Sequence, residues 1–267
     1  MKIAVFYDHI KSAVQQTGRP LEELLTEVRG MGIEGIECDA PETVEEARAF
    51  ADQLRAAGLC AANVDWKMDV MHGQCSPAQL EAIAELGARK ALVIPGFIRE
   101  GEALHDMARC TSDGLNALCD AAEPYGVTLT IEDMDNVAAP YATLEQVEWL
   151  LLNTPKLRCT FDTGNFLYSE ENELQAFEVL ASHIAHVHCK DRTFDANPGD
   201  TLTTVKGRTL YPVAVGHGRI CMGRIIRQLQ EIHYDDFVTI EHYGSVDQLG
   251  DMRRSAAWLT KALGKKA

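Results

Sequence analysis

Four short segments of the sequence each place an acidic or imidazole side chain at the end of a hydrophobic run. These side chains are Glu132 in VTLTIED, Asp162 in LRCTFD, His188 in IAHVHC and Glu241 in DFVTIEH. A carboxylate or imidazole at the end of a buried strand is costly unless something pairs with it. Carboxylate oxygens and imidazole nitrogens are also ligands for divalent cations, so the four segments together predict a metal site.

The donor types of this predicted site indicate which metal it would bind. Three carboxylates brought together repel one another and raise one another's pKa, and a divalent cation removes that penalty. Three oxygen donors and one nitrogen donor, without a thiolate, favour Mn²⁺ or Mg²⁺, with Co²⁺ and Zn²⁺ as alternatives. Taken alone, Asp162 has the alternative of starting an Asx-turn with Gly164 at positive φ, and His188 that of a core histidine.

The elements that would position these side chains alternate along the whole chain. Eight short apolar runs are each followed by a helix-length segment, and this alternation predicts a parallel sheet with crossover helices. Eight such units in 267 residues match the size of a closed (β/α)8 TIM barrel. The predicted strands are residues 2–7, 33–38, 59–65, 90–95, 127–133, 157–162, 184–189 and 236–242.

In such a barrel the C-terminal ends of strands five to eight meet at one mouth, so the four candidate ligands would converge there. An open doubly wound sheet is the alternative. It would usually have a glycine-rich nucleotide loop after the first strand, where this chain has YDHIKSAVQQTG, which we expect to be a turn. Residues 30–35 do fit G-x-G-x-x-G, but they follow a predicted helix and precede a predicted strand, which is the wrong context.

The composition predicts a globular protein with one domain spanning residues 1–267, because no linker or charge block divides the chain. The formal net charge of −15 repels phosphate backbones and makes nucleic acid a poor partner. The chain starts without a signal-peptide layout and has no membrane-length apolar run, so we expect a cytoplasmic protein that does not enter the membrane. Its eight scattered cysteines, Cys75 among them, lack CxxC pairs and predict reduced thiols.

Four further residues near the predicted mouth are candidates for substrate binding. Asn165 follows Asp162 by three positions, and Lys190 lies just past the strand of His188. Glu37 ends the second strand, where it would bond either to substrate or to ligand residues, and Trp66 would form a pocket wall. The loop of residues 192–218 would shape specificity.

The motifs IEDMDN, FDTGNF, HVHCKD, GHGRI and VTIEHYG together resemble the xylose isomerase-like TIM-barrel superfamily, in particular its sugar phosphate isomerase/epimerase group. That group includes ketose 3-epimerases, hydroxypyruvate isomerase and inosose dehydratase. The resemblance implies that Glu132, Asp162, His188 and Glu241 are the metal ligands, and that Glu132 and Glu241 form the acid/base pair. It also aligns Asn165 with a substrate-contacting position that is histidine in ketose 3-epimerases.

Three positions depart from the family pattern. The chain has Ala138 where ketose 3-epimerases have a substrate-binding glutamate, and Phe194 where they have an arginine. His217 stands where many relatives have an acidic residue between two glycines. These departures point away from a ketose 3-epimerase in the narrow sense, and HVHCKD is closer to the isomerase and inosose dehydratase members.

The chemistry implied by the resemblance is proton removal next to a carbonyl, with the metal stabilising an enediolate. The sequence therefore predicts a metal-dependent isomerase or epimerase of carbohydrate metabolism, acting on a small keto-sugar or hydroxy-carbonyl compound. A lyase of the inosose dehydratase kind is the alternative. An endonuclease IV-like phosphodiesterase would need more histidines and a basic surface, and an inactive sugar-binding barrel is a further alternative. The oligomeric state stays open, with a homo-oligomer among the alternatives.

Overall fold

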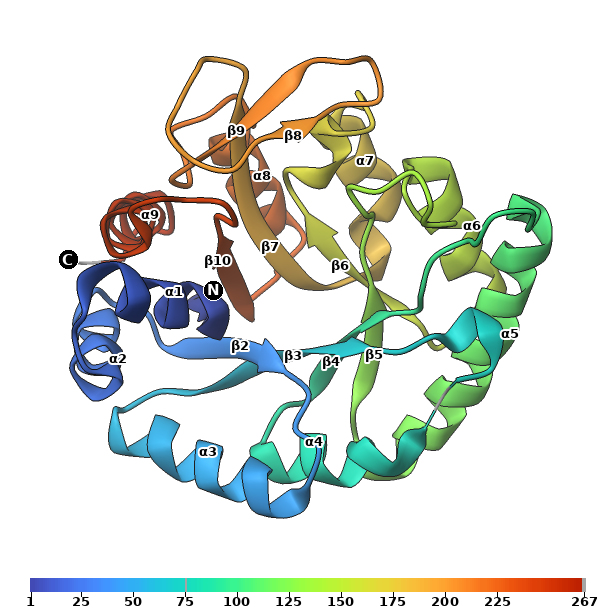
Figure 1. Ribbon diagram of the computed structural model, residues 1–267, viewed down its shortest axis with the longest axis horizontal. Coiled ribbons are helices and arrows are strands. Elements are labelled where there is room, and N and C mark those ends of the chain that lie inside the picture. Colours follow the sequence, from blue (N-terminus) through green and yellow to red (C-terminus); the bar gives the residue numbers. More distant parts are fainter. Residues whose placement is uncertain (75, 266–267) are drawn as a thin grey trace.

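The computed structural model describes residues 1–74 and 76–265. Eight parallel strands pair in chain order, and the last of them, β10, pairs again with β1, so the sheet closes into a barrel (Figure 1). This confirms the predicted (β/α)8 fold. The barrel strands are β1 (Lys2–Phe6), β2 (Gly35–Asp39), β3 (Cys60–Lys67), β4 (Lys90–Ile94), β5 (Thr128–Ile131), β6 (Arg158–Asp162), β7 (Ile184–Thr193) and β10 (Phe237–Glu241).

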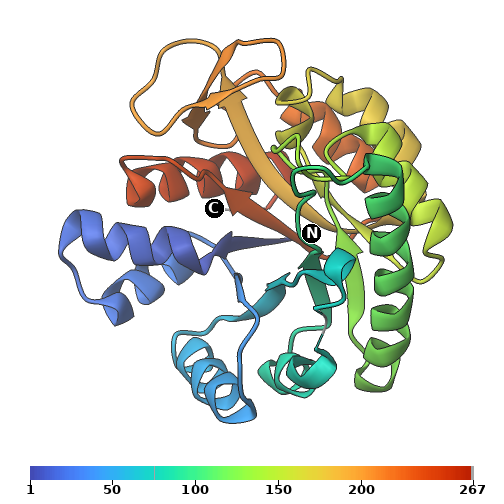
Figure 2. The ribbon, with the colours of Figure 1, turned by 45° about the vertical axis from the view of Figure 1, so that its right-hand side comes forward.

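Helices surround the barrel and cover the outer faces of its strands (Figure 2). The apolar side chains between the strands and the helices form one large buried cluster. The α-helices are α1 (Tyr7–Thr17), α2 (Leu21–Gly30), α3 (Val44–Ala56), α4 (Leu80–Leu86), α5 (Leu104–Ala122), α6 (Leu144–Asn153), α7 (Glu173–Leu180), α8 (Met222–Glu231) and α9 (Gln248–Ala262). Short 3₁₀ helices are η1 (Val70–His72), η2 (Pro77–Gln79), η3 (Glu123–Tyr125), η4 (Asn165–Leu167) and η5 (Ala181–His183).

Helix α1 occupies the segment after β1 that we expected to be a turn. Its buried face carries His9, Ile10 and Ala13, and Gly18 ends it in the left-handed conformation, with φ of 69°. This buried face includes a histidine, which an apolar periodicity does not count, so the sequence did not indicate this helix.

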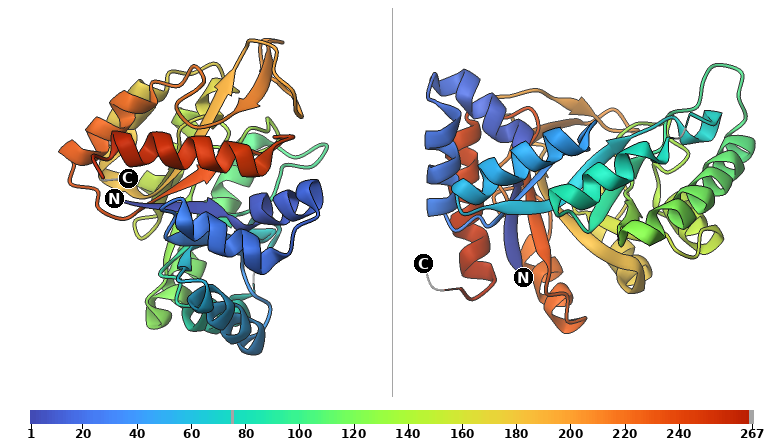
Figure 3. Two further views of the ribbon diagram at one scale, coloured as in Figure 1. Left: turned by 90° about the vertical axis from the view of Figure 1, so that its left-hand side faces the viewer. Right: turned by 90° about the horizontal axis from the view of Figure 1, so that it is seen from below.

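The segment predicted as a loop of residues 192–218 contains an additional hairpin. Strand β7 extends to Thr193, and its extension pairs antiparallel with β9 (Thr209–Val213), which pairs in turn with β8 (Leu202–Thr203). Figure 3 shows this hairpin, in orange, standing out from the barrel. The hairpin thus belongs to the same end of the barrel as the C-terminal ends of the strands.

The last glycine of the nucleotide-binding pattern, Gly35, has a packing role instead. A Cβ on Gly35 would lie 2.6 Å from the ring of Phe237 and 2.8 Å from the Cβ of Ala62. Glycine is therefore required where β2 passes close to the neighbouring strands, in agreement with our exclusion of a phosphate-binding loop.

The described cysteines are all free thiols, and four of them are buried: Cys38, Cys119, Cys159 and Cys189. Cys75 lies outside the described residues. Within the described part of the chain, no helix combines the length and the hydropathy that a membrane crossing requires.

Candidate active site

The four candidate ligands converge at the C-terminal end of the barrel, around the imidazole of His188. Its Nδ1 atom lies 2.9 Å from Oε2 of Glu132, 3.3 Å from Oε2 of Glu241 and 3.9 Å from Oδ2 of Asp162. All four residues are at least nine-tenths buried. Asp162 and Glu241 end their strands and Glu132 follows β5, whereas His188 lies in the middle of β7, which continues past the barrel.

The two carboxylate oxygens of Asp162 differ in their hydrogen bonding. Its Oδ1 atom accepts hydrogen bonds from the backbone N–H groups of Gly164 (2.7 Å) and Asn165 (2.6 Å), which is the Asx-turn of the structural interpretation. Gly164 has φ of −112°, so our expectation of a positive φ was wrong. A Cβ there would lie 2.7 Å from the carbonyl oxygen of Lys190, so this glycine permits a close approach. The Oδ2 atom of Asp162 is buried without a hydrogen-bond partner and faces the cluster.

Lys190 lies beside the cluster and contacts two of the other candidate residues. Its Nζ atom is 2.6 Å from Oε1 of Glu241 and donates a 2.7 Å hydrogen bond to Oδ1 of Asn165. Asn165 is held in turn by donating from Nδ2 to the carbonyl oxygen of Asp133. Glu241 therefore directs one oxygen toward His188 and the other toward Lys190.

Burial and neighbouring charges shift the pKa values of the carboxyl groups in the cluster in opposite directions. Burial raises the pKa of Asp162 well above its ordinary value, even though Lys190 is near, and it also raises the pKa of Glu132 against the attraction of His188. Burial acts on Glu241 in the same sense, but the charges and hydrogen bonds of Lys190 and His188 together outweigh it and lower the pKa of Glu241. Buried carboxyls that resist ionisation are the groups that a divalent cation would stabilise as anions.

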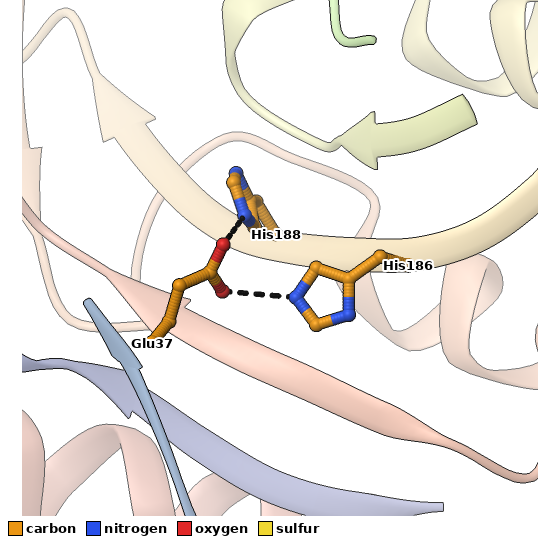
Figure 4. Close-up of side chains that lie close together, drawn as sticks. All are labelled: Glu37, His186 and His188. Carbon is orange, nitrogen blue, oxygen red and sulfur yellow. Dashed lines mark hydrogen bonds and ion pairs between the residues drawn. The ribbon is translucent and has the colours of Figure 1, made fainter. Parts of the chain in front are cut away.

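A second group of possible donors lies deeper in the barrel and consists of Glu37, His186 and His188. Figure 4 shows the Glu37 carboxylate between the two imidazoles. Oε1 of Glu37 lies 2.9 Å from Nε2 of His188, and its Oε2 lies 2.9 Å from Nε2 of His186. Burial opposes ionisation of Glu37, but the charges of His188 and His186 and their hydrogen bonds to the carboxylate together outweigh it and hold the pKa of this carboxyl well below its ordinary value.

Hydrogen bonding distinguishes the two groups. Nζ of Lys90 lies 3.2 Å from Nδ1 of His186. The lysine can only donate, so Nδ1 accepts this hydrogen bond and the hydrogen of the imidazole is on Nε2, which faces Glu37. The deeper group is thus an internally satisfied network. Glu132, Asp162 and His188 instead surround Oδ2 of Asp162, which has no hydrogen-bond partner. His188 can present Nδ1 to a cation because its Nε2–H donates to Glu37. This upper donor set fits a divalent cation.

Trp66 lies outside this cluster. Asn63, on the same strand, faces the barrel interior and donates a 2.6 Å hydrogen bond to Glu37. Asp65, two positions after Asn63, faces the same way. Side chains alternate along a strand, so Trp66 faces the helices. It is 1% exposed and donates from Nε1 to Oε1 of Gln79. The structure therefore gives no basis for a pocket wall at Trp66.

Phe6 and Tyr243 are residues of the mouth that sequence reasoning missed. The ring of Phe6 packs edge-on against His188, with ring centroids 5.0 Å apart, and also contacts Tyr243 at 5.5 Å. These rings form an apolar boundary on one side of the donor cluster. A signal was present, because Phe6 ends the first barrel strand and Tyr243 lies two residues past the end of the last one.

Asp191 explains two of the motifs that carry the resemblance, HVHCKD and GHGRI. Its Oδ2 atom accepts from the N–H groups of Gly216 and Gly218, both at 2.9 Å, and its Oδ1 accepts from that of Ile220 at 3.2 Å. A Cβ on Gly218 would lie 2.2 Å from Oδ1 of Asp191. These motifs fasten the end of the hairpin segment to β7, while His217 is exposed.

Comparison with known proteins identifies the family. Residues 25–262 match the family described as the xylose isomerase-like TIM barrel. The chain belongs to this family. Inosose dehydratase of Clostridium beijerinckii is 28% identical over 141 residues, which are 49% of this chain and 45% of that protein. The chain thus spans about half the length of the curated relatives it matches.

Solved structures share the whole fold. The structure of IolI protein with a bound zinc atom superposes with a TM-score of 0.75 and 16% identity, covering 99% of this chain and 98% of the other. An L-ribulose 3-epimerase gives a TM-score of 0.75 and 17% identity, covering 99% and 95%. At these identities the structural likeness shows a common fold.

Proposed function

We propose that the protein is a divalent-metal-dependent sugar isomerase or epimerase that acts on a small keto-sugar or hydroxy-carbonyl compound. The observation that carries this proposal is the convergence of Glu132, Asp162 and Glu241 on Nδ1 of His188, with one oxygen of Asp162 left unpaired. In the proposal these four residues hold the cation, and residues 1–267 act as one domain. A bound cation would supply positive charge to offset the negative charge that a substrate gains when a proton is removed next to its carbonyl. Mn²⁺ and Mg²⁺ suit the oxygen-rich donor set, with Co²⁺ and Zn²⁺ as alternatives.

The proton-transfer roles fall to Glu132 and Glu241. They come from β5 and β10, with β6 and β7 between them, so they approach a substrate from different sides. In this proposal one carboxylate removes the proton from the carbon next to the carbonyl, and the same or the other carboxylate returns one. The raised pKa of Glu132, caused first by burial, suits a group that must accept a proton at neutral pH.

The neighbouring polar residues would position the substrate. Lys190 and Asn165 present a cationic donor and an amide beside Glu241, and we assign to them contacts with substrate oxygens. Glu37 acts through His188: its carboxylate accepts the Nε2–H and so leaves Nδ1 to face the cation. We therefore assign Glu37 to ligand positioning and not to substrate contact.

A lyase of the inosose dehydratase kind is the second candidate, and the similarity to the clostridial inosose dehydratase favours it. The same proton removal begins both reactions. They differ in whether the enediolate is reprotonated or expels a β-hydroxyl group.

One experiment tests the proposal and separates the candidates. The metal-loaded protein is incubated in D₂O with ketoses, inososes and hydroxypyruvate, and NMR follows solvent exchange and product formation. Deuterium incorporation with retention of every hydroxyl group supports an isomerase or epimerase, whereas loss of a hydroxyl group supports the lyase. Absence of exchange with every compound, in protein shown to contain the metal, contradicts the proposal.

A further inference from the structure

Three lysine or arginine residues of the described chain are at least nine-tenths buried: Lys90, Lys190 and Arg192. Lys90 lies 2.7 Å from Oδ2 of Asp236, and Lys190 lies 2.6 Å from Oε1 of Glu241. Arg192, which is 6% exposed, differs from both. Within the described residues, its guanidinium has no carboxylate within 4.0 Å, and its one side-chain hydrogen bond runs from Nη1 to the carbonyl oxygen of Tyr243 at 3.4 Å.

The position of Arg192 on β7 directs its side chain toward the site. Side chains alternate along a strand, and His188 and Lys190 both face the donor cluster, so the next position on that face is Arg192. Asp191, between Lys190 and Arg192, faces the opposite way, toward Gly216 and Gly218. The contact with Tyr243, two residues past Glu241, places the guanidinium over the end of β10 at the mouth of the site.

The guanidinium of Arg192 is largely enclosed without a counter-charge, and its unbonded nitrogens are not among the fully buried, unpartnered atoms of the described residues, so they are open to a ligand at the mouth of the site. An unpaired buried charge destabilises a fold unless a partner neutralises it. Arginine has five N–H donors in a planar fork that matches a carboxylate or a phosphate in bidentate fashion. One long bond to a backbone carbonyl leaves most of these donors without a protein acceptor. A neutral donor would suffice for that carbonyl, so the charge of Arg192 needs another explanation.

We infer that Arg192 binds an anionic substituent of the substrate, a carboxylate or a phosphate, at the end remote from the reacting carbonyl. Arg192 lies four residues beyond His188, which is about 13 Å along an extended strand at roughly 3.3 Å per residue. The anion is therefore on a different part of the substrate from the atoms that meet Glu132 and Glu241. This inference rests on the proposed function and narrows its substrate class to acidic or phosphorylated keto compounds.

The test compares matched neutral and anionic ligands by calorimetry. Dihydroxyacetone, D-erythrulose and D-fructose are the neutral probes, their terminal phosphates are the phosphate arm, and hydroxypyruvate and 5-keto-D-gluconate are the carboxylate arm. Each is titrated into the Mn²⁺-loaded wild type and into Arg192→Met and Arg192→Lys. Arg219→Met serves as the matched control, because Arg219 is an exposed arginine of the adjoining segment. Thermal melts establish that each variant is folded.

We expect at least one anionic probe to bind the wild type roughly 10- to 100-fold more tightly than its neutral parent, as charged hydrogen bonds do. Arg192→Met should lose this advantage without weakening the neutral probes, Arg192→Lys should restore part of it, and Arg219→Met should keep it. The arm that shows the advantage identifies phosphate or carboxylate. A wild type without any anionic preference, an advantage that persists in Arg192→Met, or an equal loss for neutral and anionic probes overturns the inference.

Solvent exchange separates this inference from the proposed function. Tight binding of anions through Arg192 without deuterium exchange would refute the proposed chemistry alone. Exchange of neutral compounds without anionic preference would refute the role of Arg192 alone.

Discussion

Replacing Glu37 by glutamine should weaken metal binding although Glu37 is not among the proposed ligands. The carboxylate accepts from Nε2 of His188, Nε2 of His186 and Nδ2 of Asn63, at 2.9, 2.9 and 2.6 Å. A glutamine amide has one acceptor and one donor end. Whichever way it is turned, its NH₂ group meets an imidazole N–H, unless His188 moves its hydrogen to Nδ1.

An NH₂ group turned toward His188, or a hydrogen moved to its Nδ1, costs metal affinity, because His188 is the imidazole that faces the other ligands. A buried donor left without an acceptor costs about 1–3 kcal/mol, and a hydrogen on Nδ1 blocks the atom that faces the other ligands. We therefore expect the Kd for Mn²⁺ or Zn²⁺ to rise roughly 10- to 100-fold, the usual effect of removing an outer-shell partner. That rise corresponds to about 1.4–2.7 kcal/mol of binding free energy.

Competition with a chelating dye measures the Kd, and ¹⁵N NMR of histidine-labelled, Zn²⁺-loaded protein reports which nitrogen of His188 carries the hydrogen. Glu34→Gln is the matched control, because Glu34 precedes the same strand and pairs with Lys265 at 2.8 Å. A Kd of Glu37→Gln within about twofold of wild type, with an unchanged His188 spectrum, would refute the positioning role.

Three further predictions concern catalysis, pH dependence and the hairpin segment. Glu132→Gln and Glu241→Gln should each slow deuterium exchange by about 100-fold or more in folded, metal-loaded protein, and near-wild-type exchange in either would remove that residue as a base. Burial lowers the pKa of His186 from 6.5 to about 4. Between pH 6.5 and pH 4 the unfolded chain therefore binds a proton that the folded protein does not, and about 3 kcal/mol of stability is lost as the pH falls from 7 to 4. Urea titrations in the presence of chelator should show a correspondingly smaller loss in His186→Gln, and an equal loss in both proteins would contradict the assignment. Asp191→Asn leaves the N–H groups of Gly216 and Gly218 facing an amide that has only one acceptor atom. The free energy of unfolding should therefore fall by roughly 2–5 kcal/mol, and proteolysis near residues 214–220 should increase. Unchanged cleavage would argue against Asp191 as the residue that holds this segment to β7.

The barrel and the four converging side chains could be predicted from the sequence because both follow from local pattern. Buried parallel strands are apolar runs, and a polar residue at the end of each run is visible without knowing the fold. Closure of the barrel then converts equivalent positions, such as Glu132 and Glu241, into neighbours. His186 precedes His188 by two positions on the same strand, so it lies on the same face, where it is bonded to Glu37.

The remaining features depend on contacts between distant segments. Whether Glu37 bonds to substrate or to His188 depends on the distance across the barrel. The sequence does not give that distance, since the two residues are 151 positions apart. The hairpin exists because β7 extends past the barrel and offers an edge to β9. Trp66 was expected to follow a strand ending at residue 65, whereas β3 continues to Lys67 and includes it. The isolation of Arg192 from carboxylates has no sequence signature.

The most direct test of the account is to locate the metal. Crystals of protein loaded with Mn²⁺, measured at a wavelength where manganese scatters anomalously, should show one peak per chain between His188 Nδ1 and the carboxylates of Glu132, Asp162 and Glu241. Asp162→Asn, measured in the same way, should lose most of that peak. A peak at Glu37 and His186, or no stoichiometric ion at the mouth of the barrel, would contradict the central claim.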